Sequence, residues 1–252
     1  INCIKKLGIK VSLNNNICSV YGKGLKGYKY KKNLIFDAGN SGTCARLFLS
    51  AVIDTDKKIK ILGDESLSKR DMKRVVVPLK KFGANIKDNN GYLPVMIDKA
   101  KNLKPIKYSE NLGSAQCKSA VMIAALKTEG STYLKCKSSR NHSELMFKNV
   151  LKVPIKTKKL NGFDKIKIKG KKEFNSFNYK IPSDISSAAF FIALTLLTKN
   201  ASIKLNNINT NTTRTGFIKI LKLMGANINY ENKKKINGEE VSDIIVKYTK
   251  NF

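Results

Sequence analysis

The chain has 252 residues, and its 42% hydrophobic content excludes a disordered protein and is enough for one large core or two small ones. The best candidate for a membrane span, 188–197, is shorter than the roughly 18 residues that cross a bilayer, so no membrane segment is expected within the chain. The formal charge of +31 comes mainly from lysine, because arginine supplies five of the 49 basic residues.

The first helical pattern follows a polar turn at 37–41. From Ala45 to Val52, apolar residues recur at the i, i+3, i+4 spacing of a helix with one buried face. A short strand is predicted at 59–62 and a second amphipathic helix at 72–82, after a polar loop. Paired short strands complete this first set, so its predicted order is βαβαββ.

The same order of elements is predicted twice more. Leu79–Ile86 (LKKFGANI) returns as Leu221–Ile228 (LKLMGANI), two repeat lengths later, which gives a repeat of about 70 residues. Small polar helix starts recur at 40–43, 114–116 and 183–187. The further predicted helices are 143–151 and 213–224, and the further predicted strands are 132–134, 165–169, 202–205 and 243–247. The fold class is therefore α/β (α+β), built from repeated βαβαββ units.

The domain boundary is predicted near Tyr179, between the last strands of the second repeat and the helix start of the third. No glycine- or serine-rich linker marks it. Residues 1–178 would form a first domain, and residues 179–252 would be the first unit of a second domain.

The five cysteines form no CxxC pair, and His142 is the single histidine. Neither a zinc site nor a disulfide framework is therefore predicted, and reduced thiols in a cytosol-like compartment are expected. Cys44 and Cys117 lie in apolar helical patterns, where cysteine acts as a small hydrophobic residue.

The lysines occur nearly everywhere along the chain, and tryptophan is absent. A nucleic-acid-binding protein is expected to concentrate its basic residues and to interleave them with aromatic residues, so no nucleic-acid partner is predicted. The positions of the arginines are better indicators of anion-binding sites than those of the lysines, since a guanidinium binds carboxylate or phosphate in a bidentate fashion. All five lie in short polar clusters and are the first candidates for binding anions: Arg46, Arg70, Arg74, Arg140 and Arg214.

Four polar clusters are candidates for anion sites. The helix starts at 37–46 and 114–119 carry small residues, which leave backbone N–H groups free to meet a negatively charged ligand. The loop at 63–74 is basic on one face, and the segment 138–144 contains Arg140. A simple helix cap or a solvated charge run would explain each cluster taken alone.

Taken together and in order, the clusters resemble a known family. Six segments are similar to successive motifs of 5-enolpyruvylshikimate-3-phosphate synthase (3-phosphoshikimate 1-carboxyvinyltransferase), over essentially the whole chain. These segments are NSGTCAR (40–46), GDESLSKR (63–70), SAQCKSA (114–120), SRNHSE (139–144), PSDISSAAF (182–190) and NTTRTG (211–216).

The resemblance implies an enolpyruvyl transferase-like fold with two domains of three βαβαββ units each, the second only partly present here. It also implies an enzyme that transfers the enolpyruvyl group of phosphoenolpyruvate to the 5-hydroxyl of shikimate-3-phosphate, with no metal or cofactor. The family's N-terminal Lys-Ser-Arg segment and its acid–base carboxylates are expected outside this sequence, so no catalytic residue is nominated.

The resemblance assigns the phosphoenolpyruvate pocket to Asn40, Gly42, Thr43, Arg70 and Gln116. Glycine at position 42 generally leaves room for the herbicide glyphosate in this family, so sensitivity to glyphosate is expected.

The resemblance assigns shikimate-3-phosphate binding to Ser114, Gln116, Ser139 and Arg140, so Gln116 would reach both substrates. The sequence departs from the family pattern at Asp71 and Thr212, where proline is usual. The charge of Asp71 is expected to weaken the pull of Arg70 on an anion.

Three alternatives remain open from the sequence. The sister enolpyruvyl transferase that acts on UDP-N-acetylglucosamine typically carries a cysteine in the loop equivalent to 63–74, and this chain has none there. The others are a basic nucleic-acid-binding protein and an inactive remnant of the enzyme. The resemblance further implies a monomer when complete, located in the cytoplasm, or in a plastid if the source is eukaryotic.

Overall fold

The computed structural model describes residues 1–25, 27–30, 34–170 and 173–250. Contacts divide the chain into two compact units, which are described separately. Unit 1 comprises Ile1–Ser139 and Leu151–Ser176, and unit 2 comprises Arg140–Val150 and Phe177–Phe252.

Unit 1 begins with the short helix α1 (Asn2–Lys6) and an antiparallel hairpin of β1 (Lys10–Asn14) and β2 (Ile17–Tyr21). The sequence patterns did not predict this hairpin. All of its strand residues are at least partly exposed, so the hairpin adds little to the core, although Lys10–Asn14 does alternate polar and apolar residues.

The first repeat of unit 1 has the predicted βαβαββ order. Strand β3 (Leu34–Asp37) leads into helix α2 (Gly42–Ala51), and β4 (Ile59–Leu62) leads through the short α3 (Glu65–Ser68) into α4 (Lys73–Lys81), β5 (Asn85–Asn89) and β6 (Tyr92–Asp98). The sheet order is β3-β4-β6-β5, with β3 and β4 parallel and the other pairs antiparallel.

Helix α3 replaces part of the loop predicted before the second helix. Its start is fixed by Asp64, whose carboxylate accepts a hydrogen bond from the backbone N–H of Leu67 at 2.7 Å. Leu67 is fully buried, so this single turn also anchors the loop to the core.

The second repeat has the same topology. It consists of β7 (Lys107–Glu110), α5 (Ala115–Ala125), β8 (Ser131–Lys137), α6 (His142–Asn149), β9 (Ile155–Leu160) and β10 (Phe163–Lys169), with sheet order β7-β8-β10-β9. Strands β7 and β8 are parallel, and β10 is antiparallel to both of its neighbours. By its contacts, α6 belongs to unit 2.

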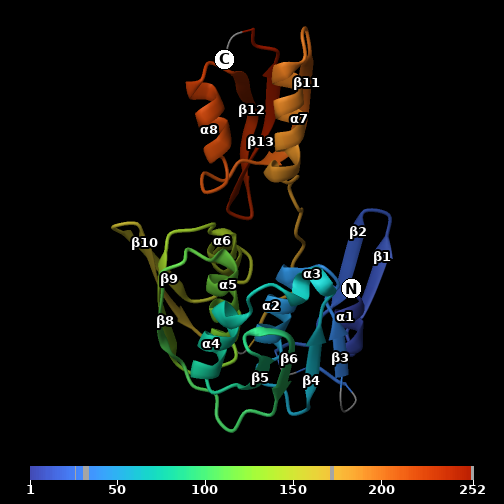
Figure 1. Ribbon diagram of the computed structural model, residues 1–252, viewed down its shortest axis with the longest axis vertical. Helices are drawn as coiled ribbons and strands as arrows, with labels where there is room; N and C mark the ends of the chain where they lie inside the picture. Colours follow the sequence, from blue (N-terminus) through green and yellow to red (C-terminus); the bar gives the residue numbers. More distant parts are fainter. Residues whose placement is uncertain (26, 31–33, 171–172, 251–252) are drawn as a thin grey trace. The chain divides into compact units, whose positions relative to one another are not determined.

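The core of unit 1 is formed by helices packed between the two sheets (Figure 1). Helix α5 packs against α2 and α4 and also against β8 and β10. The alternation predicted at 165–169 is confirmed, because Ile166 and Ile168 are buried while the lysines between them face outward.

Cys117 is fully buried in α5, and burial raises the pKa of its thiol to about 12. Cys44 lies in α2, and burial together with the nearby thiol of Cys3 raises its pKa to about 11. All five cysteines are free, and these two stay protonated near neutral pH, in keeping with the role of small hydrophobic residues.

The third repeat makes up most of unit 2. It comprises α7 (Ile185–Leu197), β11 (Ser202–Asn209), α8 (Gly216–Leu223), β12 (Asn227–Ile236) and β13 (Glu239–Lys247), with sheet order β11-β13-β12. A parallel bridge between Ser183 and Ile208 stands where the first strand of the other repeats lies. The repeated βαβαββ fold is therefore confirmed.

Helix α8 begins later than predicted. The side chain of Asn211 accepts a hydrogen bond from the backbone N–H of Thr213 at 2.8 Å, and Asn211 in turn donates its own N–H to the side chain of Asn209. Such side-chain turns compete with helical hydrogen bonds, so residues 211–215 remain outside the helix.

The core of unit 2 is one-sided. Ile185, Ile192 and Leu196 of α7 are buried against the sheet, whereas Phe190 is 79% exposed and Leu223 of α8 is also 79% exposed. The outer faces of both helices are therefore apolar and uncovered within this unit.

Candidate active site

The predicted site segments of unit 1 follow the carboxyl ends of its parallel strands. Residues 38–41 follow β3, the loop 63–70 follows β4, 111–114 follow β7 and 138–139 follow β8. Open α/β sheets bind ligands at this end of their strands, because the helices that follow present free N–H groups there.

Helices α2 and α5 begin with matching caps. Ser41 Oγ accepts a hydrogen bond from Cys44 N at 3.1 Å, and Ser114 Oγ accepts one from Cys117 N at 3.2 Å. The hydroxyl proton of each serine can still be donated to an anion. Both helix starts therefore combine a positive dipole end with a hydroxyl donor.

The turn before α5 is held by a buried carboxylate. Glu110 is 5% exposed and accepts hydrogen bonds from the backbone N–H groups of Leu112, Gly113 and Ser114 at 2.5, 3.2 and 3.3 Å. This arrangement fixes the loop that carries Ser114. The sequence reasoning missed Glu110, because β7 is mostly exposed and no strand was predicted there whose end would have marked it.

The side chains of Asn40, Asp64 and Arg70 form a chain of hydrogen bonds. Arg70 Nη2 donates to Asn40 Oδ1 at 3.1 Å, and Asn40 Nδ2 donates to Asp64 Oδ2 at 2.7 Å. The pKa of Asp64 lies below its usual range, mainly because its carboxylate accepts a hydrogen bond from the backbone N–H of Leu67 and, to a smaller extent, because it accepts one from the side chain of Asn40. Asp64 is thus ionised at neutral pH and orients Asn40, which in turn orients the guanidinium of Arg70.

Asp71 makes its contacts away from Arg70. Its carboxylate accepts a hydrogen bond from Lys73 N at 2.7 Å and lies 3.7 Å from Arg74 Nε. The observed contacts of this charge are therefore with the start of α4, rather than with the arginine whose pull it was expected to weaken.

Gln116 connects the two repeats. Its Nε2 donates to Thr43 Oγ1 at 2.9 Å, and its Oε1 accepts a hydrogen bond from Arg46 Nη1 at 2.5 Å. Because Thr43 lies in the first turn of α2 and Gln116 in the first turn of α5, these bonds hold the two helix starts together.

We call the contact between Gln116, Thr43 and Arg46 the corner. Arg46 is its buried member, with 7% of its surface exposed. It also donates from Nη2 to the carbonyl oxygen of Asp71 at 2.8 Å. Burial, and then the nearby charge of Arg74, lowers the pKa of Arg46. Nη1 and Nη2 thus each bond a protein acceptor, while the buried Nε has no hydrogen-bond partner among the described residues, so Arg46 supports Gln116 and adds positive potential to the site.

A family model described as EPSP synthase (3-phosphoshikimate 1-carboxyvinyltransferase) matches residues 1–250. The chain belongs to the EPSP synthase family. It is 40% identical to the 3-phosphoshikimate 1-carboxyvinyltransferase of Endomicrobium trichonymphae over 99% of its length and 57% of that protein. It is 42% identical to the enzyme of the same name from Caldicellulosiruptor saccharolyticus, over 98% of its length and again 57% of that protein.

The fold of this chain is similar to that of the solved EPSP synthase of Acinetobacter baumannii, with a TM-score of 0.82 and 35% sequence identity. The match covers 96% of this chain and 54% of the solved one. The chain thus spans a little over half the length of the EPSP synthases it matches.

Within this EPSP synthase-family fold, the five residues predicted for phosphoenolpyruvate lie on α2, on α5 and on the loops before α2 and α4. Direct hydrogen bonds join Asn40 to Arg70 and Thr43 to Gln116. Gly42 is buried as the first residue of α2, where an added Cβ would lie 3.2 Å from Arg46 Nη1.

The residues predicted for shikimate-3-phosphate are more dispersed. Ser114 and Gln116 share the first turn of α5, and Ser139 follows β8 with its Oγ buried and without a hydrogen-bond partner among the described residues. Arg140 is exposed and belongs to unit 2. The roles of all eight site residues stay predictions.

His142 begins α6 in unit 2. Its Nδ1 lies 2.7 Å from Glu239 Oε1, and Glu239 also accepts hydrogen bonds from Asn209 and Asn211. Burial alone would raise the pKa of Glu239, but these hydrogen bonds lower it overall.

Among the described residues, no helix is long and apolar enough to cross a membrane.

Proposed function

We propose that this chain forms part of a transferase that moves the enolpyruvyl (1-carboxyvinyl) group of phosphoenolpyruvate to the 5-hydroxyl of shikimate-3-phosphate, releasing phosphate. The observation that carries the proposal is the corner formed by Gln116, Thr43 and Arg46, which joins two helix N-termini into one positive surface. The reaction would belong to the shikimate pathway, which leads to chorismate and the aromatic amino acids.

The chemistry is an addition followed by an elimination. Protonation of the methylene carbon of phosphoenolpyruvate leaves its C2 electrophilic, and the 5-hydroxyl oxygen attacks C2 as it loses its proton. The tetrahedral product then loses phosphate from C2 and a proton from the new methyl group, which restores the double bond as an enol ether. We expect the acid–base groups for these proton transfers outside this sequence, and the reaction calls for no metal or cofactor.

The negative charges of the two substrates match the positive groups at the corner. Each substrate carries a carboxylate and a phosphate, and two like unit charges 4 Å apart repel by about 4 kcal/mol at an effective dielectric constant near 20. Fixed cations and helix N-termini must offset this repulsion. Unit 1 offers Arg46, Arg70 and Arg74 together with the starts of α2 and α5.

We assign phosphoenolpyruvate to the side of the corner nearest α2. Arg70, oriented by Asn40, would bind its charged groups, while Gly42 and Thr43 would present backbone and hydroxyl donors. Gln116 would contact both substrates.

We assign shikimate-3-phosphate to the start of α5. Ser114 would donate its hydroxyl proton, while Ser139 and Arg140 would meet the phosphate and the ring. The buried, unpartnered Oγ of Ser139 supports this assignment, because such a hydroxyl has a hydrogen bond still to make.

We further propose that the complete enzyme is a monomer in the cytoplasm, or in a plastid if the source is eukaryotic. We place its domain boundary between residues 178 and 179, where the third repeat begins. Neither a nucleic acid nor a membrane is needed for the transfer reaction itself.

Gly42→Ala tests the phosphoenolpyruvate side of the corner. The new methyl group would press on Arg46 Nη1 and disturb its bond to Gln116, so we expect affinity for phosphoenolpyruvate, measured with shikimate-3-phosphate present, to fall about three- to tenfold. Gly216→Ala is the matched control, because it also begins a helix and a Cβ there meets nothing within 4 Å. Equal affinities in both variants would contradict the assignment.

The proposed function is tested by calorimetric titration of shikimate-3-phosphate into the purified chain. We expect saturable binding that is lost in Arg140→Ala and kept in Lys148→Ala, an exposed position on α6. UDP-N-acetylglucosamine serves as the competing ligand. Binding of this nucleotide sugar instead, or no binding of shikimate-3-phosphate by a folded chain, would count against the proposal.

A further inference from the structure

The second sheet of unit 1 gathers lysines on its outward face. Strand alternation places buried residues such as Leu134 and Ile166 toward the helices and the lysines toward solvent. We call this surface the lysine face, and it consists of Lys107, Lys135, Lys156, Lys158, Lys165 and Lys167 around Tyr133. The hollow over it has a volume of about 810 Å³.

The register puts these lysines directly beside one another. Lys135, Lys165 and Lys158 are paired across β8, β10 and β9, so three lysines form one row across three strands. Lys167 and Lys156 are paired in the neighbouring row. Like charges placed directly opposite each other destabilise a sheet, and strands lie only about 4.8 Å apart.

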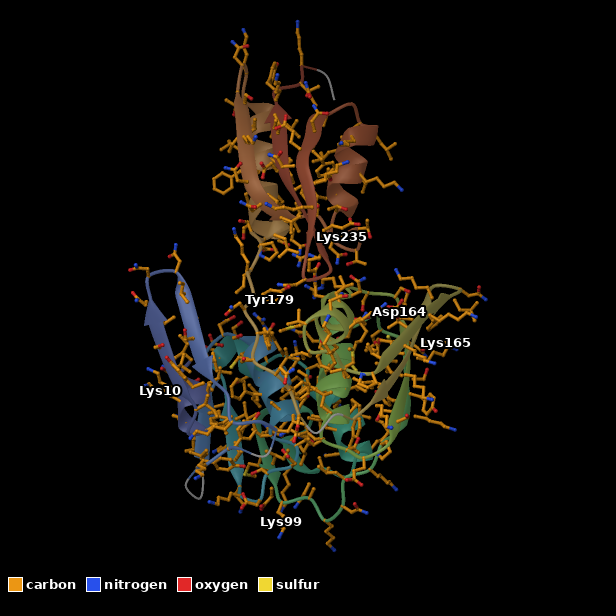
Figure 2. All side chains as sticks on the ribbon, turned by 180° about the vertical axis from the view of Figure 1, so that it is seen from behind. Lys10, Lys99, Asp164, Lys165, Tyr179 and Lys235 are labelled. Atoms are coloured by element: carbon orange, nitrogen blue, oxygen red, sulfur yellow. The ribbon has the colours of Figure 1, made fainter. Side chains whose placement is uncertain are left out.

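No acidic side chain of these four strands offsets the row. Their two acidic residues, Glu110 and Asp164, are buried on the opposite face, where Asp164 pairs with Lys118. Figure 2 labels the neighbours Asp164 and Lys165 and shows Lys165 on the outer flank of unit 1.

The four-stranded sheet of the first repeat and the three-stranded sheet of unit 2 do not share this pattern. In the first repeat, the outward row at Ile35 alternates lysines with apolar residues: Ile35, Lys60, Met96 and Lys87. In unit 2, Lys204 pairs with Glu231 at 3.1 Å and lies 3.7 Å from Asp243. A lysine-rich composition alone therefore does not account for the lysine face. The sequence prediction of no nucleic-acid partner rested on the spread of lysines along the chain and on the absence of tryptophan, and it stays a prediction.

Aromatic rings lie among these lysines. Tyr133 is 42% exposed, and the ammonium groups of Lys107 and Lys167 lie 6.0 and 5.4 Å from its ring centre. Lys135 lies 4.8 Å from the ring centre of Phe163. Phe163 is partly buried, so Tyr133 is the exposed ring of this face. Proteins that bind single-stranded nucleic acids use exposed rings flanked by cations, because bases stack on the rings and phosphates contact the cations.

We propose that the lysine face binds single-stranded nucleic acid without sequence preference, as an activity separate from the transferase site. A regular polyanion with stacking bases matches both the charged rows and the rings. An anionic membrane is the less favoured partner, because surface-bound proteins usually insert an amphipathic helix, and this face is a sheet.

The test is fluorescence anisotropy of a labelled 15-nucleotide oligo(dT) titrated with the 252-residue chain. We expect micromolar binding at low salt that weakens steeply as salt rises. The triple variant Lys135→Gln, Lys158→Gln, Lys165→Gln is expected to lose at least tenfold in affinity and to reduce the salt slope by about 2, since each phosphate contact on a single strand contributes about 0.7.

A matched control removes the same charge elsewhere. Lys233→Gln, Lys234→Gln, Lys235→Gln alters three exposed lysines of β12 in unit 2 and is expected to change affinity less than twofold. Tyr133→Ala is expected to lose at least fivefold, while Tyr133→Phe, which keeps the ring, retains binding. Circular dichroism checks that each variant is folded.

Three results would overturn the proposal. Equal losses in both triple variants would mean that total charge alone drives binding. Tighter binding to phosphatidylserine vesicles than to oligo(dT) would assign the face to a membrane. A folded chain that does not bind oligo(dT) at low salt would rule the activity out, whatever the titration with shikimate-3-phosphate shows.

Discussion

Lys118→Met is expected to lower the free energy of unfolding by about 3–5 kcal/mol. The ammonium group of Lys118 is fully buried and lies 3.2 Å from Asp164 Oδ2, whose side chain is 6% exposed. Removing the lysine leaves a buried carboxylate without its cation, which costs more than the pair itself contributes. Urea unfolding, followed by circular dichroism, measures the change.

Two companion variants separate charge from packing. Lys118→Met combined with Asp164→Leu removes both charges and is expected to recover most of the lost stability, because well-packed apolar pairs replace buried ion pairs at little cost. Lys148→Met, at an exposed helical position, is expected to stay within about 0.5 kcal/mol of the parent chain. A loss below about 1 kcal/mol for Lys118→Met would show that the buried carboxylate of Asp164 does not depend on the charge of Lys118.

Arg46→Met is expected to weaken binding of phosphoenolpyruvate at least about tenfold, equivalent to about 1.4 kcal/mol. The change leaves Gln116 Oε1 and the carbonyl oxygen of Asp71 without their donor, so the Gln116 amide is free to turn away from the ligand. It also removes a positive charge from beneath the corner. The measurement is titration of phosphoenolpyruvate with shikimate-3-phosphate present.

Arg46→Lys and Lys58→Met are the controls. A lysine keeps the charge but cannot donate to both acceptors as the planar guanidinium does, so an intermediate affinity is expected. Lys58 is exposed, and its removal changes the net charge by the same amount without touching the corner. If Arg46→Lys binds as tightly as the parent chain, the bonds of Arg46 to Gln116 and Asp71 are unimportant for the ligand.

The repeated fold could be predicted from the sequence because its signals are local and occur three times. The alternation at 165–169 and the capped helix starts at Ser41 and Ser114 are visible in any window of ten residues. The hairpin at 10–21 was missed, although its first strand alternates polar and apolar residues before a run of asparagines, which is a usable hairpin signal.

The hydrogen bonds within the candidate site could not be predicted because they join residues that are far apart in the sequence. Gln116 and Arg46 are 70 positions apart, and no local pattern indicates that one bonds the other. Arg46 was predicted to bind an anion because it lies in a polar cluster. In the structure its side chain is buried and donates a hydrogen bond to Gln116 of α5. The pairing of Lys118 with Asp164 was equally hidden, because a lysine in a lysine-rich chain gives no sign that it is buried.

Of the three helix starts that share a place in the repeat, two carry matching caps and the third differs. Ser41 and Ser114 are neutral, whereas α7 is capped by Asp184, whose carboxylate accepts hydrogen bonds from the N–H groups of Ser186 and Ser187 and pairs with Arg214 at 2.9 Å. The third start thus already holds a negative charge of its own. Equivalent helix starts of the three repeats therefore differ in charge, because α2 and α5 have neutral caps while α7 carries a carboxylate of its own. The exchange Asp184→Ser would give α7 the same neutral cap as α2 and α5 and would leave Arg214 without its carboxylate partner.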